Sequence, residues 1–198
     1  MRIRFYLLVL LFTPTFLPAT AQGALEWSDN YELQFSDFQS PSTSIGMDNN
    51  HYSLYSGCSI DFAFQMTNAE FMFTKNFNSK VNNNFVRNVA AIIAPDSVYA
   101  TNLLLFARYE FDLAELYVRK VRQQLYETKG AFSNPTFFQP IFDRIKKEFN
   151  ERHAAASQRC DLGRDREALK ELHDEARSEI NTNYPDFCKT CKPVKKKK

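Results

Sequence analysis

The chain has 198 residues, of which 15% are aromatic. That length and apolar content suit one domain with a sizeable core. The formal net charge of +2 is too balanced to indicate a nucleic-acid partner. Only five glycines occur, which excludes a glycine-rich dinucleotide-binding fingerprint.

Residues 1–21 have the features of a secretory signal peptide. Arg2 and Arg4 precede an apolar run, and the segment closes on Ala19-Thr20-Ala21, a small-x-small cleavage pattern. Thr and Pro residues interrupt the apolar run well short of the ~20 residues that a spanning helix needs. We therefore expect an exported protein, periplasmic or extracellular, with no transmembrane span once the signal is removed.

The segments that follow predict a small antiparallel sheet. Three short stretches are rich in aromatic residues and partly alternate between apolar and polar side chains. Gly57 and Thr67-Asn68 supply breaks that suit hairpins. The Asn-rich segment 76–88 is expected to contain a loop, whereas the apolar run 89–93 suits either a buried strand or the approach to a helix. The three stretches are 51–56, 59–66 and 70–77.

A long helix is predicted next. Between Leu103 and Leu125 there is no Gly or Pro, and apolar residues recur at three- and four-residue spacing. Asp96 or Ser97 is expected to cap its start, and Gly130 suits the residue beyond its end.

Charged residues on this helix stand one turn apart. Arg108 precedes Asp112, and Glu115 precedes Arg119, each by four residues, so we expect surface ion pairs. Such pairing explains Asp112 and Glu115 better than a role as general acid and base.

Two more helices are predicted after Gly130. Apolar residues repeat at helical spacing over 138–149 and again over 168–180, where Asp165 suits the cap. The predicted fold class is α+β, a small antiparallel sheet followed by about three helices. We expect one domain over 22–183 and a tail over 184–198.

The tail contains a Cys-x-x-Cys pair and ends in a lysine run. It is expected to be a disordered basic end, with contact to anionic lipid or polysaccharide as the less favoured alternative. Four cysteines in an exported chain predict two disulfides, with three possible connectivities. The preferred pairing is Cys188–Cys191 and Cys58–Cys160.

The central helix segment 106–121 reads FARYEFDLAELYVRKV. It resembles the zinc-binding helix of a bacterial family of domains of unknown function that are regarded as secreted zinc-dependent proteases. The match is close in the second half of the segment. The matching positions include Phe111, Asp112, Glu115, Tyr117 and Arg119.

The first half of the segment departs from that family. Phe106 and Glu110 stand where the resemblance implies two zinc-ligating histidines, and Ala107 stands at the position of the general-base glutamate. Phe106 cannot bind a metal and Ala107 cannot accept a proton, so the zinc chemistry implied by the family is missing here.

Two further stretches extend the resemblance. Leu25-Glu26-Trp27-Ser28 and 33–39 resemble the family's opening pattern, and Gln158-Arg159-Cys160-Asp161 resembles a late segment. The resemblance implies a zincin-like scaffold. After Asp161 the chain reads Leu162-Gly163-Arg164-Asp165 where the family continues to Thr-His-Gly, so another candidate ligand is missing.

These observations predict an exported, non-catalytic relative of the protease family that acts as a binding or envelope-structural protein. Its partner would be an envelope protein or polysaccharide, and no metal or other cofactor is expected. The alternative is an active hydrolase with a relocated or non-standard metal site, which would gather Glu110, Glu115 and either His153 or His173.

Overall fold

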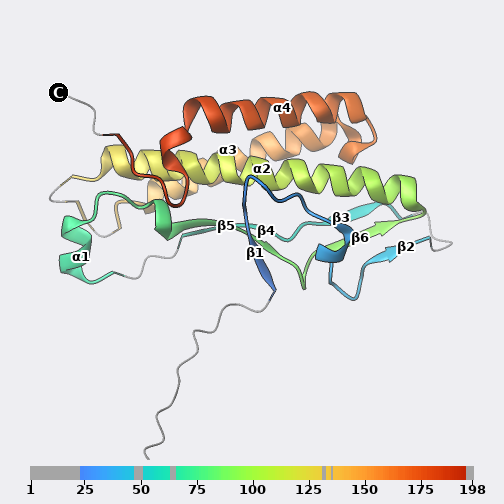
Figure 1. Cartoon of the computed structure of the whole chain (residues 1–198), viewed down its shortest axis with the longest axis horizontal. Coiled ribbons are helices and arrows are strands. Elements are labelled where there is room, and N and C mark those ends of the chain that lie inside the picture. The colour runs from blue at the N-terminus through green and yellow to red at the C-terminus, as the bar shows by residue number, and fades with distance from the viewer. Residues whose placement is uncertain (1–22, 47–50, 63–65, 131–132, 135, 195–198) are drawn as a thin grey trace, which may run out of the picture.

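The computed structural model describes residues 23–46, 51–62, 66–130, 133–134 and 136–194, and it confirms the predicted α+β class. The strands lie on one side of the long helix α2, and helices α3 and α4 lie on the other (Figure 1). The predicted signal peptide at 1–21 and the lysines at 195–198 fall outside the described residues. The helices are α1 (Asn68–Phe73), α2 (Ser97–Thr128), α3 (Gln139–Arg159) and α4 (Arg166–Asn183).

The strands form two small sheets. The first is antiparallel and has the order β1-β5-β4, whereas the second has the order β2-β6-β3 with β2 parallel to β6. The prediction of a single antiparallel sheet was therefore wrong in this detail. The strands are β1 (Ala24–Glu26), β2 (Ser44–Ile45), β3 (Ser53–Tyr55), β4 (Cys58–Phe62), β5 (Val81–Val86) and β6 (Ala91–Ala94).

The Asn-rich segment, which was predicted to contain a loop, has irregular ends but also contains the central strand β5, which the prediction missed. Val81, Asn83 and Phe85 are buried and alternate with residues that are partly exposed. The buried amide of Asn83 donates from Nδ2 to the carbonyl of Phe111 over 2.8 Å, so its polar group is placed in the core with a partner. Tertiary pairing here outweighs the low strand propensity of Asn.

The prediction of a strand at 70–77 was also wrong, because α1 occupies its first half and no strand follows there. The Thr67 side chain accepts a hydrogen bond from the Glu70 backbone, and the Glu70 side chain accepts one from the Thr67 backbone. This reciprocal capping box fixes a helix start. The stretches at 51–56 and 59–66 do contain β3 and β4, although 63–65 lie outside the described residues.

Helix α2 confirms the predicted long helix. The Asp96 carboxylate accepts hydrogen bonds from the backbone of Val98 and Tyr99, and the helix ends one residue before its C-cap, Lys129. Residues on almost every side of α2 are buried, since Phe106 belongs to one core cluster and Ala107 to a second. The helix is thus sandwiched between the sheets and the other two long helices.

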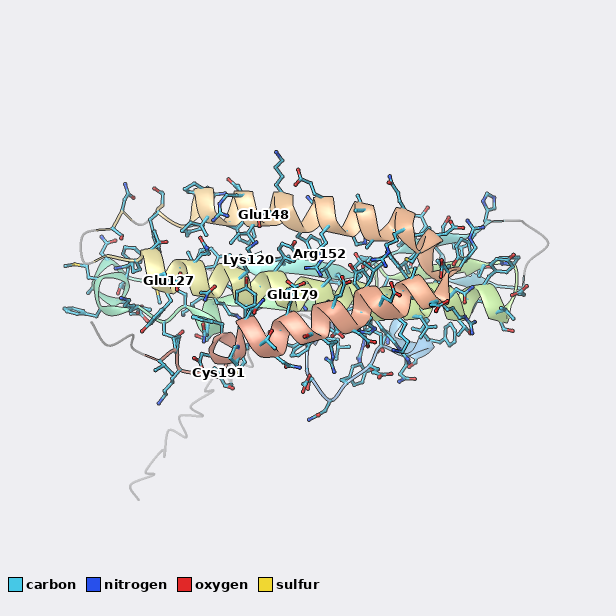
Figure 2. The ribbon with its side chains drawn as sticks, turned by 90° about the horizontal axis from the view of Figure 1, so that it is seen from above. Lys120, Glu127, Glu148, Arg152, Glu179 and Cys191 are labelled. Atoms are coloured by element: carbon cyan, nitrogen blue, oxygen red, sulfur yellow. A yellow bond between two sulfur atoms is a disulfide. The ribbon has the colours of Figure 1, made fainter. Side chains whose placement is uncertain are left out.

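Helices α3 and α4 cover the outer side of α2. Figure 2 shows them lying to either side of it. Asp165 caps α4 by accepting from the Ala168 backbone, as predicted. Arg152 of α3 and Glu179 of α4 pair at 2.7 Å, which links the two helices across α2. No helix in the described ranges combines the length and apolar character needed to cross a membrane.

The first part of the predicted disordered tail is ordered. We call residues 184–191 the C-terminal strap, because they run from the end of α4 to the strands beside α2 (Figure 1). The side chain of Asn78 donates to the carbonyls of Asp186 and Cys191, and Phe187 is buried. The basic, proline-containing composition of the tail predicted disorder. The strap is ordered because these contacts with residues far away in the sequence hold it in place.

Candidate functional site

The positions where the family resemblance implies zinc chemistry lie in the core. The Phe106 side chain is 1% exposed, and its ring packs 5.8 Å from Tyr109 and 5.6 Å from His153. Ala107 is fully buried in the second core cluster, among side chains of the sheets. Aromatic and aliphatic packing thus fills the space beside these two residues.

Glu110 is buried opposite His153. The carboxylate Oε1 and the imidazole Nε2 lie 3.4 Å apart, while Glu110 Oε2 has no hydrogen-bond partner in the described part of the chain. Burial raises the pKa of Glu110 to about 7, and a hydrogen bond from Ser56 opposes that rise. Burial also lowers the pKa of His153, so both groups favour their neutral forms.

The predicted gathering of metal ligands is only partly present. Glu110 and His153 meet, but Glu115 lies with two arginines and His173 lies with Asp112. Among the described residues, no group of three or more His, Cys, Asp and Glu side chains is placed to hold a metal ion.

Trp27 connects two distant segments that carry the family resemblance. Its indole Nε1 donates to Asp112 Oδ1 over 2.7 Å, and its ring lies 5.4 Å from the guanidinium of Arg119. The predicted pairing of Arg108 with Asp112 was wrong: Arg108 pairs with Glu32, and Asp112 contacts His173. The Asp112 carboxylate is thereby held by Trp27, which follows β1, and by His173 of α4.

Glu115 and Arg119 do pair, but in the interior instead of on the surface. Glu115 Oε1 accepts from Arg119 Nε at 2.9 Å and from Arg122 at 3.1 Å, and all three residues are buried. Burial raises the pKa of Glu115 and lowers that of Arg122, while their mutual attraction opposes both shifts. Arg122 also donates to the carbonyls of Val81 and Phe187.

A cavity of about 470 Å³ opens beside this network, and we call it the Trp27 cleft. Its walls come from the end of β1, from β5, from α2 and from the strap. The lining residues are Glu26, Trp27, Ser28, Asn83, Glu115, Arg119, Arg122, Cys188, Lys189 and Thr190. Cationic and hydrogen-bonding groups therefore face one space with an indole ring at its edge, an arrangement suited to binding a polar ligand.

The other retained family-like positions serve packing. Phe111 lies in the core with its ring 5.9 Å from Phe85, and Tyr117 packs edge-on against Phe149. A smaller cavity of about 160 Å³ lies on the Asp112 side and is lined by His173 and Arg177 among others.

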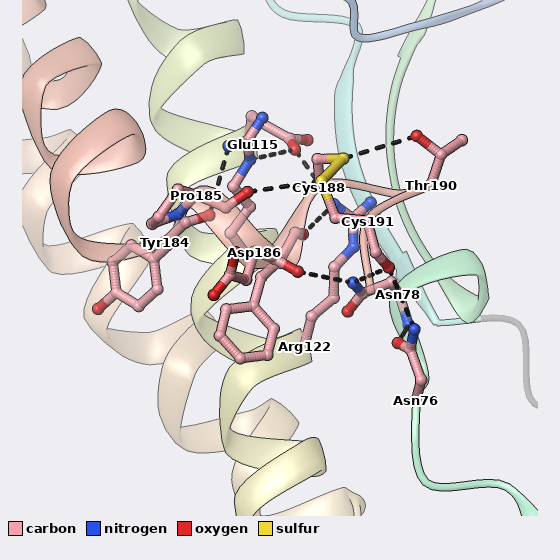
Figure 3. The surroundings of a disulfide bond; sticks show 12 residues. Asn76, Asn78, Glu115, Arg122, Tyr184, Pro185, Asp186, Cys188, Thr190 and Cys191 are labelled. Carbon is pink, nitrogen blue, oxygen red and sulfur yellow. Dashed lines mark hydrogen bonds and ion pairs between the residues drawn. A yellow bond between two sulfur atoms is a disulfide. The ribbon is translucent and has the colours of Figure 1, made fainter. Parts of the chain in front are cut away.

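The strap carries the disulfide. Cys188 and Cys191 are bonded, as predicted, and Figure 3 shows the bond beside the Glu115 and Arg122 side chains. The second predicted pair was wrong, because Cys58 and Cys160 are both free thiols. Cys160 is buried at the end of α3, whereas Cys58 is the first residue of β4. Each cysteine therefore belongs to a different element, and the two are not bonded.

Replacing both strap cysteines with serine, Cys188→Ser and Cys191→Ser, is expected to lower the free energy of unfolding by about 2 kcal/mol, because the unfolded chain gains the freedom of a short loop. Urea unfolding with and without reductant measures this. Reductant should destabilise the wild type equally and leave the double variant unchanged. A reductant effect on the double variant would mean that Cys58 and Cys160 are bonded.

Sequence reasoning missed Asn83, Arg122 and Lys189 in the cleft. One signal was present, since Arg122 follows Glu115 by seven residues and Arg119 by three, which places all three on one face of a helix. Asn83 belongs to the segment predicted to contain a loop, and Lys189 to the tail predicted to be disordered.

No protein-family model matches the chain, and no curated protein or solved structure is significantly similar to it. The resemblance to the secreted zinc-protease family therefore stays a prediction that rests on the residues named for it.

Proposed function

We propose that the chain is an exported, non-catalytic relative of the secreted zinc-protease family that acts as a binding or envelope-structural protein. The packing of Phe106 and Ala107 supports this most directly. Phe106 lies in an aromatic cluster and Ala107 in the adjoining core, at two of the three positions where the resemblance implies zinc chemistry.

Two further features support the proposal. The Cys188–Cys191 disulfide fits an oxidising compartment, where such bonds persist, and residues 1–21 read as a signal for export. Asp112 and Arg119 of the family-like half of α2 contact Trp27 beside the Trp27 cleft. A chain that kept this half while losing the ligand positions is best explained by retention of binding.

The test is zinc content and peptidase activity of the purified full chain. We expect the protein to hold well below one equivalent of zinc after dialysis. We also expect no chelator-sensitive cleavage of a broad-specificity peptide substrate. Stoichiometric, tightly held zinc together with chelator-sensitive cleavage would contradict the proposal.

The alternative, an active hydrolase with a relocated metal site, predicts a different result in the same assay. Activity would then depend on the histidine–carboxylate contact that includes one of the original positions, Glu110 with His153. Glu110→Gln and His153→Ala would both abolish it, whereas Glu175→Gln on the exposed face of α4 would leave it unchanged.

A further inference from the structure

The Trp27 cleft contains more positive than negative charge in its buried wall. Two guanidinium groups, those of Arg119 and Arg122, share the single carboxylate of Glu115, and all three residues are at most 7% exposed. The other charged pair on the lining, Lys189 with Glu26 at 2.6 Å, is balanced within itself. One buried cationic charge is thus left without a full counter-charge, which favours an anionic ligand.

Arg119 and Arg122 both line this space, but Arg119 uses fewer of its N–H donors within the protein. Arg122 directs its N–H groups to Glu115 and to the carbonyls of Val81 and Phe187. Arg119 donates Nε to Glu115 and has only a long 3.4 Å contact from NH1 to the Tyr184 carbonyl. Its planar fork therefore keeps donor capacity for a carboxylate.

Asn83 supplies the complementary acceptor in the same cleft. Its Nδ2 donates to the carbonyl of Phe111, which fixes the orientation of the amide. Asn83 is one of the lining residues of the cleft, and its Oδ1 is buried and accepts no hydrogen bond from the described residues. A buried acceptor of this kind costs free energy until a donor reaches it.

We propose that the Trp27 cleft binds a peptide C-terminus, whose carboxylate pairs with Arg119 and whose neighbouring N–H donates to Asn83 Oδ1. This inference rests on the proposed binding function and deepens it. A C-terminal residue carries both groups within a few bonds of each other, and Trp27 offers apolar surface to its side chain. Among its described residues the cleft has one unpaired acceptor, Asn83 Oδ1, and a peptide C-terminus offers one N–H donor beside its carboxylate. An acidic sugar would instead present several hydroxyl groups, so we favour a peptide.

The fluorescence of Trp27, the single tryptophan of the chain, provides the readout. N-acetylalanine has the carboxylate and the N–H, N-acetylalaninamide lacks the carboxylate, and propionate lacks the N–H. We expect a saturable fluorescence change with N-acetylalanine and an affinity at least about tenfold lower for each of the other two, since each loses one hydrogen-bonding group.

Variants locate the binding. Arg119→Gln is expected to weaken N-acetylalanine binding at least about tenfold, because a charge-assisted bidentate contact is lost. Lys189→Gln at the rim provides a second variant if Arg119→Gln fails to fold by circular dichroism, and it should weaken binding to a smaller extent. Arg144→Gln on the exposed face of α3 is the matched control and should bind as the wild type does.

Three results would overturn the inference: no saturable response to N-acetylalanine, equal affinity for its amide, or tighter binding of glucuronate or sulfate. Each is distinguishable from failure of the proposed function. Zinc-dependent peptidase activity removes the non-catalytic proposal, whereas absent carboxylate binding in a chain without that activity removes only the peptide-terminus site.

Discussion

Arg122→Met is expected to destabilise the fold by about 3–5 kcal/mol, the cost typical of breaking a buried ion pair from one side. The Arg122 side chain is 2% exposed and joins Glu115 of its own helix to the carbonyls of Val81 in β5 and Phe187 in the strap. Methionine fills much of the volume but leaves both carbonyls without this donor and leaves Glu115 with Arg119 alone. Urea unfolding at pH 7 measures the loss.

Arg144→Met is the matched control for this substitution. Arg144 is half exposed and pairs with Glu148 on the surface of α3, so its loss should cost less than about 1 kcal/mol. Equal effects of the two substitutions would contradict a structural role for the buried network. Limited proteolysis should also cut Arg122→Met sooner within the strap, because the Phe187 carbonyl loses its anchor.

The three long helices were predictable because their signals are local. Asp96 and Asp165 each precede an apolar repeat and each caps a helix in the structure. The same local signals left Asp96 and Ser97 as alternative caps of α2, and the structure has Asp96 in that position. What they did not reveal is that α2 is buried on nearly all sides, since that depends on which elements pack around it.

The strands were harder to predict because strand formation depends on pairing with segments that are distant in the sequence. The Asn-rich segment lacks strand propensity, yet β5 pairs on both edges, with β1 and with β4. Conversely, the aromatic stretch after Thr67 resembles a strand, but the capping box of Thr67 and Glu70 starts a helix. That box was readable in the sequence, whereas the pairing of β5 was not.

The candidate site was half predictable. Spacing identified the Glu115–Arg119 pair, and the family resemblance included Trp27 and Asp112, but neither indicated that Trp27 would contact Asp112 and Arg119. The cleft is built from β1, β5, α2 and the strap, which are far apart in the chain. Such convergence depends on the tertiary fold, so Asn83 and Lys189 could not be assigned to it from pattern alone.

Glu110→Gln is expected to stabilise the protein above pH 7 by about 3 kcal/mol and to have little effect near pH 4.5. Burial raises the pKa of Glu110 from 4.5 to about 7, and a tenfold change in proton affinity between the unfolded and folded chains corresponds to about 1.4 kcal/mol. The folded state therefore favours the protonated carboxyl. That contribution is fully present below pH 4.5 and is lost as the pH rises towards 7.

Urea unfolding of the wild type and Glu110→Gln between pH 4.5 and 8 tests this, with the difference in free energy as the measured quantity. His153 has the opposite effect on the pH dependence of stability. Burial lowers its pKa, so its contribution to stability is present above pH 6.5 and is lost as the pH falls below that value. His153 is present in both proteins, so its own burial cancels in the difference, which then reports the carboxyl together with its contact to His153. Glu175→Gln on the exposed face of α4 is the control and should give a flat difference. A flat difference for Glu110→Gln as well would mean that the fold does not raise the pKa of Glu110, which would contradict the prediction.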